Sequence, residues 1–181
     1  MCKETDPQQD VAATEIDLGE IVSTAVEQCS SVAQTRRVTV HADLPEHAVT
    51  VRGERGLLVQ AIANLIENGI NYNRENGKVQ VRLSRLNRNE SDSESQWEVS
   101  VADTGIGIPS SALKHVFERF YRVDKARSRE RGGTGLGLAI VKHIALAHGA
   151  SVHVESEVNK GSTFYMRFKS TVPQSHPVAE A

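Results

Sequence analysis

A cluster of glycines stands immediately before a helical pattern in the later part of the chain. Four of the six residues from Gly132 to Gly137 are glycine, and an apolar helical spacing follows at once. Glycine lets backbone N–H groups close around an anion, and the first turn of a helix adds unpaired N–H donors and partial positive charge. The pattern therefore predicts a phosphate site, although a plain surface loop could have the same composition.

The two common glycine motifs for nucleotides do not fit this cluster. A P-loop requires Lys and then Ser or Thr after its last glycine, but Leu138 follows Gly137. A dinucleotide fingerprint requires a glycine at its sixth position, where this sequence has Leu138 or Ile140. A phosphate site here must belong to another class of protein.

A helix predicted to end near Tyr72 carries an unusual polar face. The side chains of Asn64, Glu67, Asn68 and Asn71 fall on a stripe roughly 100° wide, opposite the apolar residues. Asn is a mediocre helix former, and a merely solvated face would more often use Lys, Glu and Arg; that reading stays open. Amide and carboxylate oxygens are hard ligands that suit Mg²⁺.

Asp103 opens a loop, Asp-Thr-Gly-Ile-Gly-Ile-Pro, that follows a strand of buried character. An ionised carboxylate accepts hydrogen bonds and donates none, so it suits the exocyclic amine of adenine better than a phosphate. Guanine presents a carbonyl oxygen at the equivalent place, so Asp103 would select ATP over GTP. The alternative is a simple Asx-type turn, which is common where Asp precedes Gly.

Helices and strands interleave around these motifs. Apolar spacing predicts helices from Asp17, from Leu58 to about Tyr72 and from about Leu136 to His148. Period-two alternation predicts strands at 37–42, 49–52, 79–83, 97–101, 151–157 and 162–168. We expect helices on one face of a mostly antiparallel sheet, in one domain over 15–170 between a flexible arm (1–14) and a disordered tail (171–181).

Composition narrows the function classes. A net charge of -2 and 4% aromatic residues argue against a nucleic-acid partner or an anionic membrane surface. Cys2 and Cys29 make no disulfide framework, and Cys29 falls on an apolar helical stripe. Neither a membrane-spanning stretch nor a signal peptide is evident, so we expect a soluble intracellular chain.

Taken together, the motifs resemble those of one family. Asn64-Leu-Ile-Glu-Asn68, the Asp103–Pro109 loop and Gly133-Thr-Gly-Leu-Gly137 stand in this order, with Phe117-Glu-Arg-Phe-Tyr-Arg122 before the last. The set closely resembles the ATP-binding catalytic domain of bacterial sensor histidine kinases, of the GHKL superfamily, over roughly 16–168. The resemblance implies the Bergerat fold, an α+β two-layer sandwich with a mixed, mostly antiparallel sheet under three helices and an ATP lid.

The resemblance also implies roles for residues. Asn68 resembles the ligand of Mg²⁺, Asp103 the reader of adenine and Thr163 a hydroxyl near the adenine. Glu67 resembles an acid that would orient the accepting imidazole, so Glu67 and Asn68 are the predicted catalytic residues. The residues implied to bind ATP are Asn64, Asn68, Asn71, Tyr72, Asp103, Gly105, Gly107, Ile108, Lys125, Arg131, Gly133, Thr134, Gly135, Leu136, Gly137 and Thr163.

Two features of the implied lid and phosphate site bear on that set. Phe117, Phe120 and Tyr121 resemble the residues that anchor the lid. Asn71 stands where the family often has a basic residue, and Lys125 or Arg131 in the lid could supply the missing charge.

The implied activity is an ATP-dependent protein-histidine kinase, with transfer of the γ-phosphoryl group to a histidine on a dimerisation domain. None of the seven histidines precedes an acidic residue, as the family's acceptor histidine does, so we expect each to be an ordinary surface residue. The chain is then an excised catalytic domain, monomeric alone, from a membrane-anchored homodimeric bacterial receptor that signals to a response regulator. Alternatives are a non-catalytic nucleotide-gated module, an anti-sigma-factor serine kinase and plain ATP hydrolysis.

Overall fold

The helices and strands follow the predicted order. The structure is a computed structural model, and it describes residues 14–86, 96–123 and 134–169. Its elements are β1 (Thr14–Asp17), α1 (Leu18–Arg36), β2 (Thr39–Asp43), β3 (Thr50–Gly53), α2 (Arg55–Asn71), β4 (Lys78–Leu86), β5 (Gln96–Asp103), α3 (Ser110–Leu113), α5 (Gly137–Ala147), β6 (Ser151–Glu157) and β7 (Gly161–Lys169).

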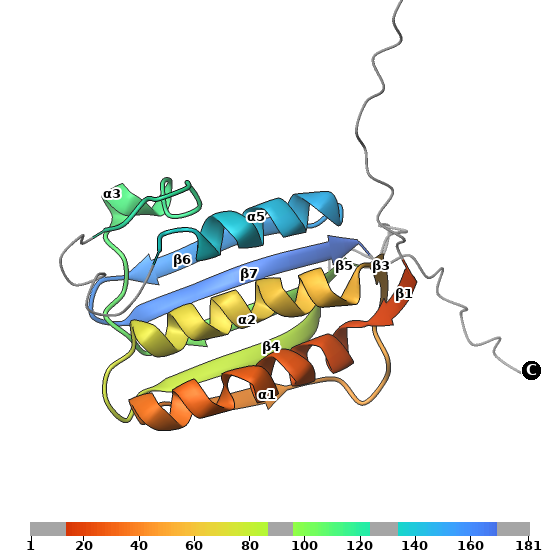
Figure 1. The fold of residues 1–181 in the computed structure, drawn as a ribbon, viewed down its shortest axis with the longest axis horizontal. Coiled ribbons are helices and arrows are strands. Elements are labelled where there is room, and N and C mark those ends of the chain that lie inside the picture. Colours follow the sequence, from red (N-terminus) through yellow and green to blue (C-terminus); the bar gives the residue numbers. More distant parts are fainter. Residues whose placement is uncertain (1–13, 87–95, 124–133, 170–181) are drawn as a thin grey trace, which may run out of the picture.

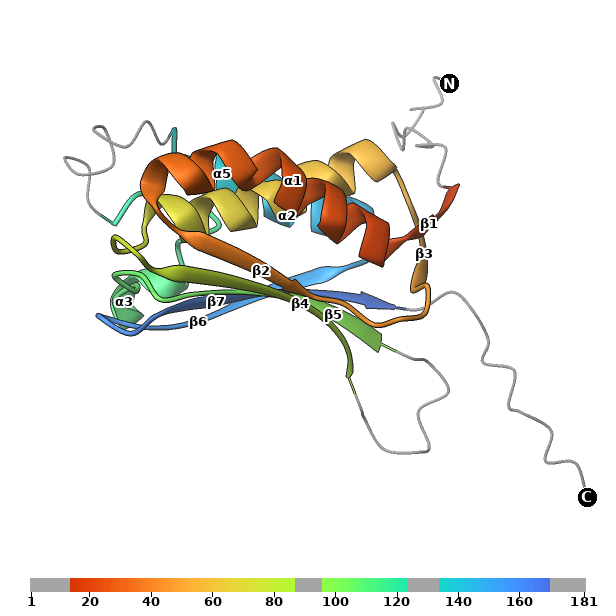
Figure 2. The same cartoon turned by 90° about the horizontal axis from the view of Figure 1, so that it is seen from below.

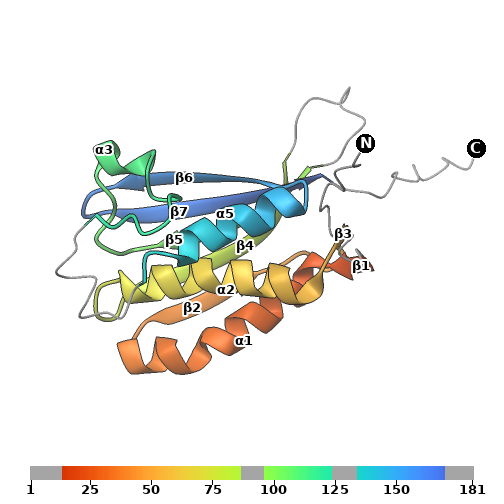
Figure 3. The ribbon, with the colours of Figure 1, turned by 45° about the horizontal axis from the view of Figure 1, so that its top comes forward.

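A five-stranded sheet forms one layer, in the order β2-β4-β5-β7-β6. The β2–β4 pair is parallel and the other pairs are antiparallel, so the sheet is mixed and mostly antiparallel. The helices α1, α2 and α5 lie side by side on one face of this sheet, with α2 in the middle (Figures 1 and 3). Figure 2 shows the two layers from the side. The predicted α+β two-layer sandwich is confirmed.

The core lies between these layers, and the inner face of α2 is at its centre. Leu58, Ile62, Leu65 and Ile66 are almost fully buried there, at helical spacing. Each such side chain contributes roughly 1.5–3 kcal/mol when it leaves water. Since these residues and the alternating apolar residues of the strands hold the fold, the polar face of α2 is not needed for it.

Cys29 of α1 is also a core residue, as predicted, with 1% of its surface exposed. Burial disfavours the thiolate, and the nearby Glu67 carboxylate opposes it too; together they raise the pKa of Cys29 to about 11. The thiol is therefore protonated at neutral pH.

The short strand β1 was not predicted from the sequence. It pairs with β3 in a separate two-stranded sheet and leads directly into α1. Asp17 caps the helix because its Oδ1 accepts hydrogen bonds from Gly19 N and Val49 N, each at 3.0 Å. The predicted arm and tail lie outside the described residues, apart from Thr14, the first residue of β1.

His148 is more than the surface residue expected from the sequence. Its Nδ1–H donates to Ile144 O at 2.7 Å, and its Nε2 accepts from Glu54 N at 3.0 Å. The ring thereby joins the end of α5 to the start of α2. No helix in the described ranges is long and apolar enough to cross a bilayer.

Candidate nucleotide-binding site

The asparagines of α2 lie against the beginning of α5. A Cβ atom placed on Gly137, the first residue of α5, would be 3.9 Å from Asn64 Oδ1 and 3.9 Å from Asn68 Nδ2. No side chain caps this helix, so N–H groups of its first turn remain available. The predicted asparagine face and the predicted helix N-terminus are thus brought together.

At this site, the described residues leave a hydrogen-bond donor of the Asn64 side-chain amide unsatisfied. Its Nδ2 atom is buried, and it has no hydrogen-bond partner among the described residues. A buried amide donor without an acceptor costs roughly 1–3 kcal/mol, so such groups are normally satisfied. A phosphate oxygen beside the α5 N-terminus would satisfy it, and the site therefore fits an anion.

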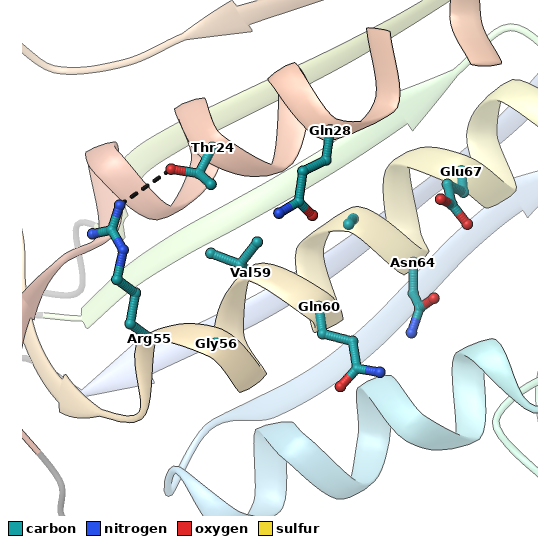
Figure 4. A pocket seen from close by; sticks show the side chains of 9 residues that line it. Thr24, Gln28, Arg55, Gly56, Val59, Gln60, Asn64 and Glu67 are labelled. Atoms are coloured by element: carbon teal, nitrogen blue, oxygen red, sulfur yellow. Dashed lines mark hydrogen bonds between the residues drawn. The ribbon is translucent and has the colours of Figure 1, made fainter. Parts of the chain in front are cut away.

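The other two polar residues of the α2 stripe, Glu67 and Asn71, line two separate hollows. Glu67 is exposed and lines a cleft of about 450 Å³ between α1 and α2, together with Asn64 (Figure 4). Asn71 lines a separate hollow of about 380 Å³ beside the end of α1. Of the predicted stripe, Asn64 and Glu67 therefore share one cleft, and Asn71 lines another hollow.

Asp103 ends β5 and begins the glycine loop. Its Oδ1 accepts a hydrogen bond from Gly105 N at 2.7 Å, which forms the Asx-type turn that the sequence offered as the alternative. Burial disfavours the charged carboxylate and raises its pKa from 3.8 to about 6, although hydrogen bonds from Gly105 and Ser162 lower it in part. The turn accounts for the local geometry, and because each carboxylate oxygen can accept more than one hydrogen bond, the group can accept a further donor beside Gly105 and Ser162.

The glycine loop after Asp103 forms backbone hydrogen bonds with the end of α2 and with the β6–β7 turn. Ile106 donates its N–H to the carbonyl of Tyr72 at 3.1 Å, and its own carbonyl accepts from Asn159 N at 2.8 Å. A Cβ on Gly105 would lie 2.3 Å from the Tyr72 carbonyl oxygen, so only glycine allows this approach. The loop thus joins Asp103 to the end of α2, where Tyr72 was predicted to lie near the nucleotide.

The hydroxyl beside Asp103 belongs to Ser162, and sequence reasoning chose its neighbour Thr163. Because strand residues alternate between faces, Ser162 of β7 shares the helix-covered face with Phe164, whereas Thr163 shares the opposite face with Tyr165. The structure therefore does not bring Thr163 together with Asp103. Only the strand register reveals this difference of one residue.

A second serine extends the hydroxyl network, and it was also missed. Ser156 Oγ lies 3.0 Å from Ser162 Oγ, donates to Gly161 O at 2.9 Å and accepts from Ile108 N at 2.8 Å. Ile108, predicted to bind ATP, is thus tied by its backbone to the end of β6. The network connects the last strand pair with the Asp103 loop.

The base of the lid is closed by a backbone hydrogen bond from Phe120 N to Gly135 O at 2.8 Å. Phe117 packs edge-on against Phe164 of the core, with ring centroids 6.2 Å apart. The Phe120 side chain is 70% exposed, so its backbone and not its ring holds this junction. Thr134, Gly135 and Leu136 lead into α5; Lys125, Arg131 and Gly133 lie outside the described residues.

The donors present fit Mg²⁺ only together with a phosphate ligand. In the part of the chain that the structure describes, no group of three His, Cys, Asp or Glu side chains could hold a metal ion. Asn68 is half-buried beside the N-terminus of α5 and offers one hard amide oxygen. Mg²⁺ commonly takes one or two protein ligands, substrate phosphates and water, so this single donor fits that arrangement.

Known proteins share both the sequence and the fold. Residues 53–172 match the family described as histidine kinase-, DNA gyrase B-, and HSP90-like ATPase. The sensor-like histidine kinase SenX3 of Mycolicibacterium smegmatis is 44% identical over 162 residues, which cover 89% of this chain and 40% of that protein. The chain thus spans about two fifths of the length of this curated relative.

Two solved structures share the fold at 26% identity. The mycobacterial sensor histidine kinase MprB gives a TM-score of 0.71, covering 87% of this chain and 97% of that one. Full-length ShkA in complex with AMPPNP gives 0.75, covering 91% and 33%. The chain therefore belongs to the histidine kinase-, DNA gyrase B-, and HSP90-like ATPase family, as an ATP-binding catalytic domain of the sensor histidine kinase type.

Proposed function

We propose that this domain binds Mg²⁺-ATP and transfers the γ-phosphoryl group to a histidine on a dimerisation domain. The observation that carries the proposal is the meeting of Asn64 and Asn68 with the N-terminus of α5, where the buried Asn64 Nδ2 has no acceptor among the described residues. An anion fits there, and a base-reading carboxylate, Asp103, lies at the end of the neighbouring strand.

Asp103 selects adenine in this proposal. Gly105 and Ser162 already donate to the carboxylate, and its remaining acceptor capacity takes the hydrogen bond of the adenine amine. Guanine would place a carbonyl oxygen against the carboxylate, and two acceptors repel. Gly105, Gly107 and Ile108 let the backbone pass close to the base.

Ser162 supports the carboxylate, which gives a test between two adjacent hydroxyls. We expect Ser162→Ala to weaken ATP binding about 5- to 12-fold, because one hydrogen bond worth ~1–1.5 kcal/mol is removed. Thr163→Ala, on the opposite face of the sheet, should change the affinity less than about twofold. Calorimetric titration of both variants with ATP measures the difference, and equal losses would contradict the role of Ser162.

The phosphates lie between α2 and α5 in this proposal. Asn68 would hold the metal, Asn64 Nδ2 would donate to a phosphate oxygen, and the backbone N–H groups of the Gly133–Gly137 motif would bind the phosphates. When bound, Mg²⁺ would neutralise charge on the phosphate oxygens. Lys125 and Arg131 of the lid replace the positive charge that Asn71 does not supply.

Phosphoryl transfer needs alignment and charge stabilisation more than covalent help from the protein. A ring nitrogen of the acceptor histidine attacks the γ-phosphorus and forms an N–P bond, while the bond to the β–γ bridging oxygen breaks and ADP leaves with that electron pair. Glu67 orients the ring and receives the proton of the other ring nitrogen. Glu67 is exposed and makes no ion pair with any described residue, so it is available for this role.

The wider setting follows from the sensor kinases to which the chain is similar. We propose that the domain works on the cytoplasmic side of a membrane-anchored, homodimeric bacterial receptor and that its phosphoryl group passes on to a cognate response regulator. The domain alone is monomeric and has no nucleic-acid partner.

Titration and radiolabelling test the function. The chain should bind ATP with Mg²⁺ and discriminate strongly against GTP, without labelling any of its own seven histidines. With ATP that carries ³²P in its γ-phosphate and a histidine-bearing dimerisation hairpin of a sensor histidine kinase, the label should appear on the hairpin in an acid-labile bond. Nucleotide binding without transfer would support a non-catalytic module, phosphate release alone would indicate an ATPase, and label on serine would indicate a serine kinase.

A further inference from the structure

The cleft between α1 and α2 is distinct from the proposed nucleotide-binding site, although the two share Asn64 at one end of the cleft. Its volume is about 450 Å³, and its lining includes the small or apolar residues Gly56, Val59 and Ala63. Figure 4 shows Gln28 reaching from α1 toward α2, while Gln60 and Asn64 extend toward α5. The cleft is therefore lined by small or apolar residues and by the polar side chains of both helices.

The cleft leads to the place where the γ-phosphate would lie. Asn64 and Glu67 form one end of it, and the amide of Asn64 also contacts the surroundings of the α5 N-terminus. On its other side α2 packs against α5. An acceptor that must reach both the phosphate and the Glu67 carboxylate can therefore approach along the α1 side.

We propose that this cleft is the docking groove for the helix that carries the acceptor histidine, an inference that rests on the proposed function. A helix can approach the cleft closely because Gly56 and Ala63 are small. The two glutamines of the cleft offer hydrogen-bond donors and acceptors to a polar helix surface. At the far end Arg55 is engaged by Glu20 and Thr24, so Glu67 is the charge left to meet the N–H of an imidazole. Charge complementarity and continuity with the phosphate site thus agree on the occupant.

A matched pair of substitutions on α1 tests the groove. Gln28→Arg places a long cation in the cleft, whereas Gln34→Arg places it on an exposed part of the same helix outside the cleft. Arg and Gln have similar helix propensities, so both variants should fold. We expect both to bind ATP within about twofold of the unchanged chain, because neither residue contacts the proposed nucleotide site.

Binding is followed by amide chemical shifts of the ¹⁵N-labelled chain, saturated with Mg²⁺ and a non-hydrolysable ATP analogue. Titration with the same histidine-bearing hairpin should shift the amide signals of cleft residues such as Thr24, Gln28 and Gln60. Gln28→Arg should weaken hairpin binding at least tenfold and Gln34→Arg less than twofold. The proposal is overturned if the shifts gather on another face, if both variants bind alike, or if concentrating the chain alone produces the same shifts, which would assign the cleft to self-association.

The transfer assay distinguishes a failure of the proposed docking groove from a failure of the proposed kinase function. If the hairpin occupies the cleft but gains no label, the kinase function fails and the groove stands. If label is transferred and Gln28→Arg transfers as fast as the unchanged chain at limiting hairpin concentration, the groove fails and the kinase function stands.

Discussion

Asp103→Asn is expected to lower the affinity for ATP at least 100-fold, about 2.7 kcal/mol, and to leave the fold intact. The reason lies in the turn. Gly105 N donates to Oδ1 at 2.7 Å, so an asparagine must direct its oxygen to Gly105 and its NH₂ group to the adenine amine. Two donors then face each other where a carboxylate would have accepted.

The same substitution is expected to stabilise the ligand-free domain at pH 8. Burial raises the pKa of Asp103 from 3.8 to about 6, so between these values the folded state binds more protons than the unfolded state. The free energy of unfolding therefore falls as pH rises through this window and stays lower above it, by up to ~3 kcal/mol. Asparagine does not ionise and avoids this cost.

Calorimetric titration with ATP and urea unfolding at pH 4 and pH 8 check both halves. Asp43→Asn is the matched control, because Asp43 is exposed and its ion pair with Arg82 at 2.8 Å lies on a surface where such pairs contribute little. Unchanged ATP affinity in Asp103→Asn would remove Asp103 from the site. A loss of stability at pH 8 would contradict the cost assigned to its buried charge.

Gly161→Ala is expected to destabilise the domain by about 3–5 kcal/mol. Gly161 begins β7 with φ +117°, a backbone conformation that L-residues rarely adopt, and a Cβ there would lie 1.9 Å from the Asp103 carbonyl oxygen. Either the β6–β7 turn or the end of β5 must move. Since both border Asp103, ATP binding should also weaken in whatever fraction remains folded.

Gly149→Ala is the control for this prediction. Gly149 also has a positive φ, +63°, but no atom lies within 4 Å of a Cβ built on it. Only the left-handed backbone then opposes the change, at a cost of about 1–2 kcal/mol. Denaturant unfolding of the two variants measures the difference, and equal losses would show that the close approach to Asp103 is relieved without strain.

The sequence predicted most of the fold because the main elements have strong local patterns. The helical spacing of α2 and α5 and the alternation of β4, β5 and β7 are each visible within one segment. The short strand β1 was missed because four residues show little pattern and its pairing with β3 is distant in sequence. The hydrogen bond from Glu54 N to His148 was missed for the same reason, because these residues are distant in sequence.

The candidate site was predictable in residue types but not in register. Asn64, Asn68 and Gly137 belong to motifs that a single sequence displays, and the fold brings them together. The exchange of Ser162 for Thr163 arose because two adjacent hydroxyls look alike until the pairing of β5 with β7 decides which one faces the helices. Ser156 needed both strands and a loop to be placed before its contacts became visible.

The buried thiol of Cys29 can report when the helical layer opens, because it reacts only when it becomes exposed. Electrophilic labels need the thiolate and a path to the sulfur, and Cys29 in the closed domain offers neither. In a Cys2→Ser background, the rate of labelling would therefore count the openings between α1 and α2, without a probe that disturbs either helix. Slower labelling on addition of ATP would measure how far nucleotide binding stabilises the packing of α1 on α2.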